Sequence, residues 1–233
     1  RQRQITDGAP AERTACIPNG IDYPRFEAVR TQREPGVPHV ICFIGRVVPI
    51  KDVKTFIRAM RTVVNQLPDV EVWIAGPEEE DADYARDCHN LAEGLGLAAH
   101  IKFLGLQVVD GLLPKAGVVV LSSISEALPL VVLEANAAGV PCVTTDVGAC
   151  RQLIEGMNDE DRALGASGAV VGIANPEALG RAILDLLTGS EKWHAAQQAG
   201  VERVRRYYTE AGMLEQYREE YASALALRTG GAA

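Results

Sequence analysis

Short runs of apolar, β-branched residues alternate with windows in which apolar residues recur every three or four positions, from about residue 38 onward. The first pattern predicts strands that are buried on both faces, and the second predicts amphipathic helices that cover them. Six strands are expected, at residues 39–45, 70–76, 100–105, 117–123, 141–145 and 168–173. Alternation of this kind is typical of repeated βαβ units, so the sequence predicts an α/β fold with one parallel sheet.

Helices are expected between these strands, at residues 52–66, 81–95, 130–138 and 148–155. The apolar residues of the first helix share one face, and Asp52 stands where it can cap the helix. After residue 176 the pattern is helical only, with one segment that ends at Gly189 and two longer helices at 191–208 and 210–227. The sheet is therefore followed by a helical C-terminal part.

The chain is expected to contain one sheet domain with shorter flanking parts. Residues 17–190 form this domain, 191–227 are helices that pack on it or cross away from it, and 228–233 are a disordered tail. Residues 1–16 are polar, hold no apolar leader and do not begin with Met, so we interpret them as a linker that follows a missing N-terminal domain. The polar stretch at 155–168 is interpreted as a long loop.

The composition limits the classes of protein to which this chain can belong. The 233 residues are 47% hydrophobic and 23% charged, which is typical of a globular protein whose core needs neither disulfides nor metal. A net charge of -8 argues against nucleic acid as a partner. No apolar run reaches about 18 residues, and the five cysteines form no C-x-x-C pair, which favours a cytosolic protein with reduced thiols.

Two cations follow the first expected strand. Open parallel sheets bind ligands at the carboxyl ends of their strands, where loops lead into helix N-termini. Arg46 and Lys51 lie in such a loop, and two cations beside a helix N-terminus favour a phosphate or diphosphate ligand. The alternative is that both are solvated loop charges.

Two carboxylates follow the fourth expected strand. Glu126 lies in the loop after Ser122 and Ser123, and Glu134 lies in the apolar window of the next helix. A carboxylate is costly to bury alone, so Glu134 is expected to have hydroxyls or cations nearby. The alternative is an ordinary surface glutamate, because the chain has three glutamate pairs at this eight-residue spacing.

Two further patterns carry no function. The stretch "GLGLAA" at 94–99 matches a dinucleotide-binding fingerprint, but it follows a helix and precedes a strand, which is the reverse of the required order. Asp81 and Asp83 match the D-x-D metal motif, but they lie at the start of an expected helix, where acidic side chains interact favourably with the helix dipole. The four histidines show no ligand spacing. We therefore expect no metal.

The motifs taken together resemble one family. "IPNGID", "GRVVPIKD", "IAGP", "FLG", "SEALPLVVLEA" and "GVPCVTTDVGA" occur in the order and at the approximate spacing found in the donor domain of family 4 retaining glycosyltransferases, over roughly residues 15–225. This resemblance implies one half of a GT-B glycosyltransferase: a Rossmann-like parallel sheet with helices on both faces, followed by C-terminal helices. Within the family, the chain is most similar to the Pel exopolysaccharide glycosyltransferases.

The resemblance implies a role for each charged candidate. Arg46 and Lys51 would hold the donor diphosphate, Glu134 would bind the ribose hydroxyls, and Glu126 would face the transferred sugar. Arg46, Lys51 and Glu126 would thus be the catalytic residues. The substrate would be a UDP-sugar, with no metal or other cofactor.

Three leucines complete the donor site that the resemblance implies. Backbone amides around Leu128 and Leu130 would help to bind the phosphate, and the loop at Leu106 would flank the base. The chain departs from the family at Ala127, where glycine is common. If the φ angle there has to be positive, Ala127 is strained.

The activity and partners of the whole protein also follow from the resemblance. It implies a retaining hexosyltransferase for bacterial exopolysaccharide, cytoplasmic, with an acceptor-binding N-terminal domain absent from this chain and with recruitment to the inner membrane face by an export complex. The isolated chain is expected to bind the donor without efficient transfer. The alternatives are a nucleotide-sugar sensing module without catalysis and a UDP-sugar epimerase of the same fold.

The last helix has an apolar face that the sheet does not need. In the family this helix crosses back to brace the other half, so the face is expected to be exposed here; the alternative is ordinary packing on the sheet. Its residues are Met213, Leu214, Tyr217 and Tyr221.

Overall fold

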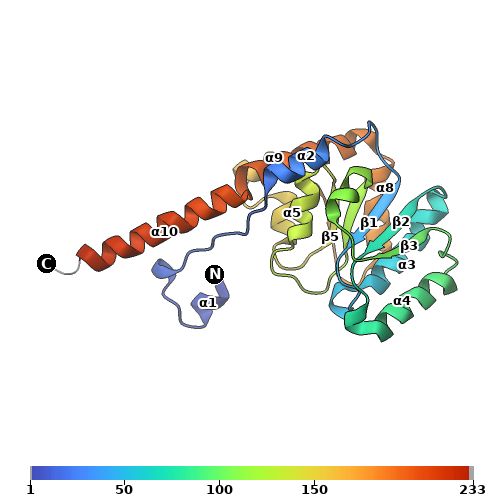
Figure 1. Ribbon diagram of the computed structural model, residues 1–233, viewed down its shortest axis with the longest axis horizontal. Coiled ribbons are helices and arrows are strands. Elements are labelled where there is room, and N and C mark those ends of the chain that lie inside the picture. The colour runs from blue at the N-terminus through green and yellow to red at the C-terminus, as the bar shows by residue number, and fades with distance from the viewer. Residues whose placement is uncertain (1, 231–233) are drawn as a thin grey trace.

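The computed structural model describes residues 2–230, with side chains from residue 4 to residue 226. Six parallel strands form one sheet, in the order β3-β2-β1-β4-β5-β6 (Figure 1). All six predicted strands are present, each within two residues of its predicted ends. Their bounds are β1 Val40–Ile44, β2 Glu71–Ala75, β3 Ile101–Gly105, β4 Val118–Leu121, β5 Cys142–Thr145 and β6 Gly168–Val171.

Ten α-helices lie in the described part of the chain, with five short 3-10 helices between them. The α-helices are α1 Gln2–Thr6, α2 Tyr23–Arg30, α3 Val53–Gln66, α4 Ala82–Gly94, α5 Leu130–Ala137, α6 Cys150–Glu155, α7 Asp159–Arg162, α8 Pro176–Leu187, α9 Ser190–Tyr207 and α10 Glu210–Gly230. The 3-10 helices are η1 Ala11–Arg13, η2 Pro49–Lys51, η3 Glu79–Asp81, η4 Val109–Gly111 and η5 Leu113–Lys115.

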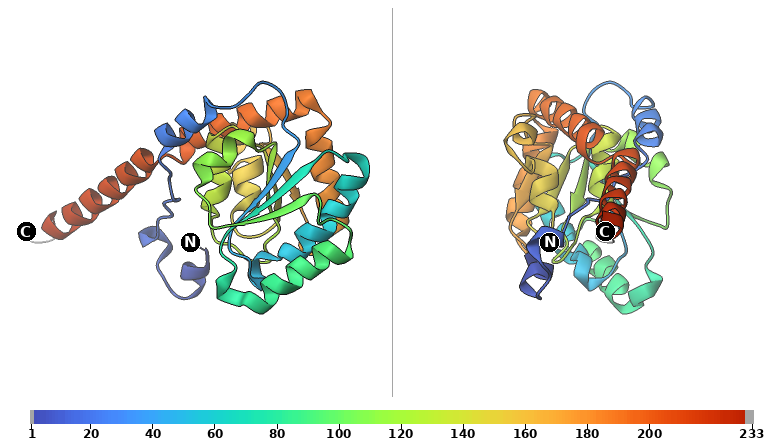
Figure 2. Two further views of the ribbon diagram at one scale, coloured as in Figure 1. Left: turned by 45° about the vertical axis from the view of Figure 1, so that its right-hand side comes forward. Right: turned by 90° about the vertical axis from the view of Figure 1, so that its left-hand side faces the viewer.

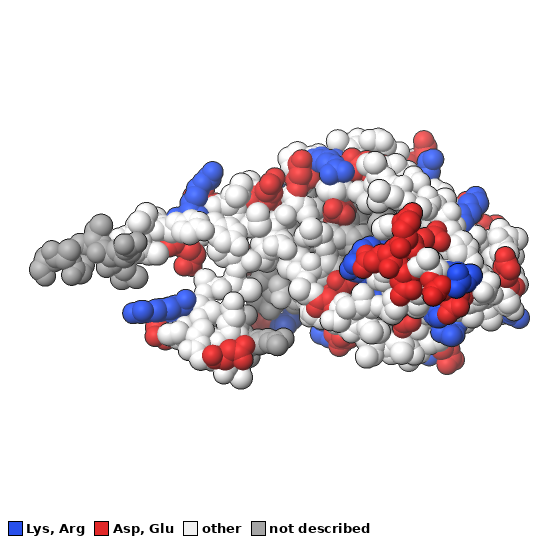
Figure 3. Space-filling view, turned by 60° about the horizontal axis from the view of Figure 1, so that its bottom comes forward, with Lys and Arg blue, Asp and Glu red and all other residues white. Residues whose placement is uncertain are grey.

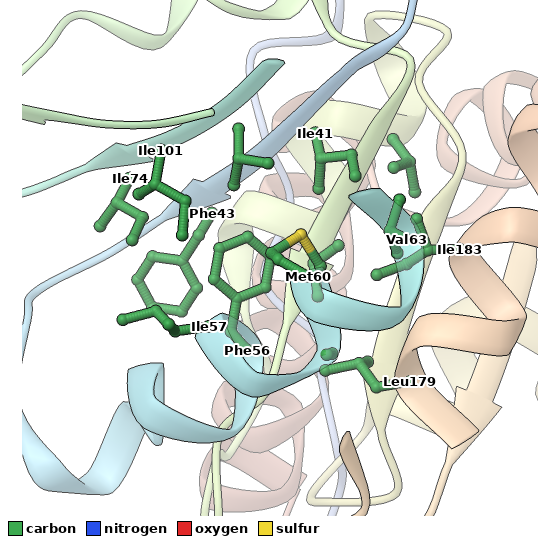
Figure 4. Packing of buried hydrophobic residues seen from close by; sticks show 14 of the residues in the cluster. Ile41, Phe43, Phe56, Ile57, Met60, Val63, Ile74, Ile101, Leu179 and Ile183 are labelled. Atoms are coloured by element: carbon green, nitrogen blue, oxygen red, sulfur yellow. The ribbon is translucent and has the colours of Figure 1, made fainter. Parts of the chain in front are cut away.

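Helices cover both faces of the sheet, and each face has its own apolar core. On one face α3 and α8 pack against the strands, and Figure 4 shows Phe56 and Met60 of α3 beneath Ile41 and Phe43 of β1. On the other face α2, α5 and α6 form a second cluster of buried side chains. The predicted α/β Rossmann-like fold is thus confirmed.

The strand order places β1 in the middle of the sheet. From β1 the chain moves outward through β2 to β3 and then returns to add β4 on the other side of β1. Loops that leave β1 and β4 therefore turn away in opposite directions. This divergence is where open α/β sheets bind ligands.

The stretch at 155–168, predicted as a long loop, connects α6 to β6 and is irregular except for one helical turn. The stretch contains α7, whose Asp161 forms an ion pair of 2.6 Å with Arg203 of α9. Both side chains are 0% exposed, and Arg203 also donates to the carbonyl oxygens of Ile154 and Gly165. The polar sequence suggested an exposed segment, but Asp161 is buried and its charge is paired inside the protein.

The C-terminal part departs from the prediction at its end. Residues 228–230 were expected in a disordered tail, but they continue α10; residues 231–233 lie outside the described residues. Figures 1 and 2 show α10 projecting away from the sheet domain. Its Leu214, Tyr217 and Tyr221 are exposed, as the sequence predicts, whereas Met213 is half-buried and its sulfur accepts a hydrogen bond from the amide of Gly20.

Of the residues expected to form a linker, the structure describes 2–16, which contain α1 and η1 and lie outside the sheet (Figure 2). In the described chain we find no helix with the length and apolar character that crossing a bilayer requires.

Candidate functional site

The loops after β1 and β4, two neighbouring parallel strands, are hydrogen-bonded to each other at the carboxyl edge of the sheet. The Ser122 hydroxyl donates to the carbonyl oxygens of Lys51 at 2.9 Å and Asp52 at 3.0 Å. The amide of Ile124 donates to the carbonyl oxygen of Ile50 at 3.0 Å. These bonds fix the position of Lys51 relative to the β4 loop.

Lys51 and Glu126 meet at this junction. The Lys51 Nζ atom lies 2.5 Å from Glu126 Oε1, and the Ser123 hydroxyl donates to the same oxygen at 2.6 Å. The two charged side chains are only 19% and 12% exposed. Within the described chain no group donates to Glu126 Oε2, so that oxygen can accept a hydrogen bond from a ligand hydroxyl.

The loop after β5 supports Glu126 from the other side. The amide of Ala149 donates to the carbonyl oxygen of Ala127 at 2.9 Å, and a Cβ atom on Gly148 would lie 2.3 Å from the carbonyl oxygen of Glu126. Among the described non-glycine residues, positive φ angles occur at Asp52 and Ala174. Ala127 is therefore not strained, which removes the doubt about the path of this loop.

Arg46 lies in the loop after β1, at the same edge of the sheet. The amide of Val47 donates to the carbonyl oxygen of Pro77 at 3.0 Å, which joins this loop to the one after β2. The Arg46 guanidinium bonds to Glu80 of η3 at 2.5 Å, and both side chains are half exposed. Arg46 is thus neutralised by a carboxylate that a bound anion would have to displace.

Glu80 belongs to an acidic run at residues 78–81. With its lower side turned forward, the molecule shows acidic side chains gathered on that face, with Lys and Arg side chains at their border (Figure 3). Of this run, Glu80 is the residue that contacts a donor-binding candidate, Arg46.

Glu134 lies in the second turn of α5 and is half-buried. No group in the described chain donates a hydrogen bond to its carboxylate. The pKa of the Glu134 carboxyl is raised, chiefly because burial disfavours its charged form. The positive charge of Arg25 opposes this rise, and the negative charge of Asp110 adds to it. The cation that the sequence analysis required near Glu134 is thus Arg25 of α2, which is far away in the sequence.

The predicted leucines also lie at the carboxyl edge of the sheet. Leu106 directly follows β3 and is 81% exposed, Leu128 is half-buried against the second apolar cluster, and Leu130 opens α5 with an exposed side chain. An exposed leucine such as Leu106 suits contact with a flat, apolar ligand surface. Its role, like those of the other candidates, stays a prediction.

The structure thus unites some predicted residues and adds others. Lys51 and Glu126 are in contact. Arg46 pairs instead with Glu80, and the pKa of Glu134 is affected by Arg25 and Asp110; the sequence analysis singled out none of these three partners. Ser123 could have been found from its place at the end of β4, but the bond to Glu80 and the influence of Arg25 come from tertiary packing. No cluster of metal-ligating side chains occurs in the part of the chain that the structure describes, and the absence of a metal stays a prediction.

Known proteins resemble this chain in sequence and in fold. The family model described as glycosyl transferases group 1 matches residues 25–203. A D-inositol 3-phosphate glycosyltransferase of Corynebacterium urealyticum is 27% identical over 84% of this chain and 48% of its own length. A phosphatidyl-myo-inositol mannosyltransferase of Mycolicibacterium smegmatis is 28% identical over 93% of this chain and 55% of its own.

The fold has a counterpart among solved structures. Anabaena Alr3699/HepE in complex with UDP superposes with a TM-score of 0.80 at 21% identity, covering 94% of this chain and 60% of that one. This chain spans about half the length of the two curated relatives. The narrower likeness to Pel transferases stays a prediction, because neither relative is named for that activity. Since the family model covers most of the chain, the chain belongs to the family glycosyl transferases group 1.

Proposed function

We propose that this chain is the donor-binding half of a retaining glycosyltransferase and that it binds a UDP-hexose. The observation that carries the proposal is the contact of Lys51 with Glu126, where the loops after β1 and β4 meet at the carboxyl edge of the sheet. A cation there can bind the diphosphate, while the open oxygen of Glu126 accepts a hydroxyl of the sugar. UDP is favoured because a protein of the same fold was solved with UDP.

The proposed reaction breaks the bond between the anomeric carbon and the diphosphate oxygen, and the electron pair leaves with UDP. The acceptor hydroxyl forms the new bond on the same face, and its proton passes to the departing phosphate. Negative charge grows on the diphosphate in this step, so Lys51 and Arg46 stabilise the transition state more than the ground state.

Donor binding is tested on the chain as it stands. In a panel of UDP-, ADP- and GDP-sugars, a ligand at about 100 times its Kd raises the free energy of unfolding by about 2.7 kcal/mol. We expect that shift with UDP-sugars, and about 10- to 100-fold weaker binding by Lys51→Ala and Arg46→Ala. Lys102→Ala is the control, because Lys102 pairs with Glu71 on the exposed surface of β2 and β3. Absence of a shift with every nucleotide sugar would overturn the proposal.

The acceptor side of the reaction is proposed to come from a second domain. The chain spans about half of its curated relatives, and the exposed face of α10 can contact such a domain. We expect the isolated chain to bind UDP-sugar without transferring the sugar. Efficient transfer by these 233 residues alone would contradict this part of the proposal.

For the acceptor we propose an exopolysaccharide of the Pel type, on the sequence resemblance alone. A second candidate is an inositol phosphate or a phosphatidylinositol, which the names of the curated relatives favour. Transfer of labelled hexose by the longer protein to each acceptor decides between them. The same assay tests the two alternative functions. An epimerase would change the stereochemistry of the sugar with no acceptor present, and a sensing module would bind the nucleotide sugar without changing it.

A further inference from the structure

A cavity of about 520 Å³ lies between the segment that joins α2 to β1 and the helix α9. Residues from both sides line it, among them Arg33, Pro35, Trp193, His194, Gln198 and Val201. Arg33 and Trp193 bond to the backbone directly before β4, so the cavity lies at the edge of the sheet where the strands begin. The proposed donor site lies at the opposite edge. A volume of this size is usual for small-molecule sites in proteins.

The cationic side of the cavity is held in a fixed position. Arg33 donates from Nη1 to the carbonyl oxygen of Leu113 at 2.5 Å and from Nη2 to that of Ala116 at 2.8 Å. The Nε1 atom of Trp193 donates to the carbonyl oxygen of Gly117 at 2.6 Å. The guanidinium carbon of Arg33 lies 5.4 Å from the centroid of the Trp193 ring. These contacts position Arg33 without neutralising it, because carbonyl groups and an aromatic ring carry no net charge.

Arg33 is half-buried and has no carboxylate partner in the described chain. Arg203, which is 0% exposed, shows the usual arrangement, since Asp161 pairs with it. Every other arginine that lacks a carboxylate partner, among those whose side chains the structure describes, is exposed; these are Arg13, Arg58 and Arg61. Arg33 is thus the exception among the arginines of the described chain.

The burial of Arg33 has an electrostatic consequence. Burial lowers the pKa of its guanidinium to about 10, because the charged form is costly away from water, and the group is still charged at neutral pH. A charge that is removed from water without a counterion destabilises the fold, and a bound anion would relieve that cost.

Two carboxylates also line the cavity, and neither of them pairs with Arg33. Glu202 is bonded to two arginines of its own helix. Glu34 is exposed and forms no ion pair within the described residues. The positive charge of Arg33 therefore has no counterion inside the cavity.

The rest of the lining suits an organic molecule better than a bare ion. His194 and Gln198 are exposed polar side chains that can form hydrogen bonds, whereas Pro35 and Val201 offer apolar surface. Small-molecule sites combine apolar surface with a few placed polar groups in this way.

We propose that this cavity is a second binding site, for a small organic anion whose carboxylate or phosphate group pairs with Arg33. The body of the anion contacts Pro35 and Val201. The site does not depend on the proposed donor site, because the two lie at opposite edges of the sheet.

Trp193 makes binding at this site directly measurable. The chain has two tryptophans, so Trp73→Phe leaves Trp193 as the single source of tryptophan fluorescence. That variant is titrated with citrate, which carries carboxylates, and with glucose 6-phosphate, which carries a phosphate, while sodium chloride keeps the ionic strength constant. We expect a saturable change in Trp193 emission with at least one probe, and the tighter probe identifies the anionic group. No saturable change with either probe would overturn the proposal.

Two variants test the role of charge in the cavity. Arg33→Gln keeps a donor for the neighbouring carbonyl oxygens but removes the positive charge, so it should weaken binding of the probe about 10-fold or more. Gln198→Glu adds a negative charge to the lining and leaves the bonds of Arg33 intact, so it should also weaken binding, even if Arg33→Gln does not fold. Arg58→Gln and Gln66→Glu are the matched controls, because they make the same charge changes at exposed positions of α3. Binding that survives both cavity variants would contradict the proposal.

Lys51→Ala separates this cavity from the donor site. A probe that bound at the donor site would lose affinity in Lys51→Ala and keep it in Arg33→Gln, which would overturn the proposal. We expect the reverse. Calorimetry with UDP should give the same Kd for the wild type and for Arg33→Gln, so the outcome at the cavity and the outcome for the proposed function are read independently.

Discussion

Lys51 and Glu126 are largely withdrawn from water, and each compensates the charge of the other, with the Ser123 hydroxyl as a further donor to Glu126. Ion pairs of this kind contribute little net stability, because desolvation offsets their attraction, but the loss of one partner leaves the other charge without compensation. The pair therefore keeps two charges in fixed positions at the proposed donor site, although burying them lowers the free energy of unfolding.

Replacement of Lys51 by Met should lower the free energy of unfolding by about 1–3 kcal/mol, because Glu126 then keeps Ser123 as its single donor. The double variant Lys51→Met, Glu126→Gln should recover most of this loss, since no uncompensated charge remains. Urea unfolding measures both changes. Lys102→Met, at an exposed pair, should change stability by less than about 1 kcal/mol; an equal effect at both lysines would contradict the argument.

Glu80 competes with a donor diphosphate for Arg46. We expect Glu80→Gln to tighten UDP binding by up to about fivefold, the value of an exposed ion pair. Calorimetry at low ionic strength measures the change. Glu79→Gln is the matched control, because Glu79 bonds the neighbouring amide of Glu78 and not Arg46. Weaker binding by Glu80→Gln would show that Glu80 orients Arg46 instead of competing for it.

At the scale of elements, every candidate residue lies in a loop that follows a strand of the sheet or in the first two turns of the helix after it. The loops after β1, β4 and β5 are tied together by hydrogen bonds, from the Ser122 hydroxyl to the backbone of the β1 loop and from the amide of Ala149 to the carbonyl oxygen of Ala127. The segment that contains α7 is held in place in a different way. It is fixed by one buried ion pair between Asp161 and Arg203.

Loss of that pair should destabilise the whole domain. Arg203→Leu leaves Asp161 buried without its cation, and removes donors from the carbonyl oxygens of Ile154 and Gly165, so we expect a loss of about 3–5 kcal/mol. Denaturant unfolding measures it. Arg205→Gln on the same helix breaks only an exposed pair with Glu202 and should leave the midpoint unchanged. A stable Arg203→Leu variant would mean that α7 is dispensable.

The sequence predicts the fold closely and the site in part, for physical reasons. Strands buried on both faces have long apolar runs, so periodicity identifies all six, and the motif loops that follow them locate Lys51 and Glu126. Asp161 and Arg203 could not be predicted, since a charge that is paired in the core resembles a surface charge in the sequence. The effect of Arg25 on Glu134 was hidden for the same reason, because it is an electrostatic influence between two helices that are far apart in the sequence.

At the scale of the molecule, α10 is the element that the sheet domain does not account for. It joins the domain near its start, where the amide of Glu210 donates to the carbonyl oxygen of Ile21 at 2.8 Å, and then projects away (Figure 1). Tyr217 and Tyr221 stack on each other with ring centroids 6.4 Å apart on its exposed side. The face is thus apolar without being buried.

Replacement of Tyr217 and Tyr221 by Ser should therefore change the free energy of unfolding of this chain by less than about 1 kcal/mol, because exposed side chains contribute little to it. In a protein that carries the proposed second domain, the same double change should lower the stability of the contact between the domains. Differential scanning calorimetry on both proteins makes the comparison. A large loss of stability in the isolated chain would show that the pair packs on this domain.

The projection of α10 also gives the chain a shape that solution scattering can record without any ligand. A helix of 21 residues is about 30 Å long, comparable to the diameter of a small domain. A compact chain of this size has a radius of gyration of about 17 Å, and a helix that stands clear of the body makes the measured value larger. Small-angle scattering can thereby test the projection directly, since a radius of gyration near the compact value would show that α10 folds back on the sheet domain.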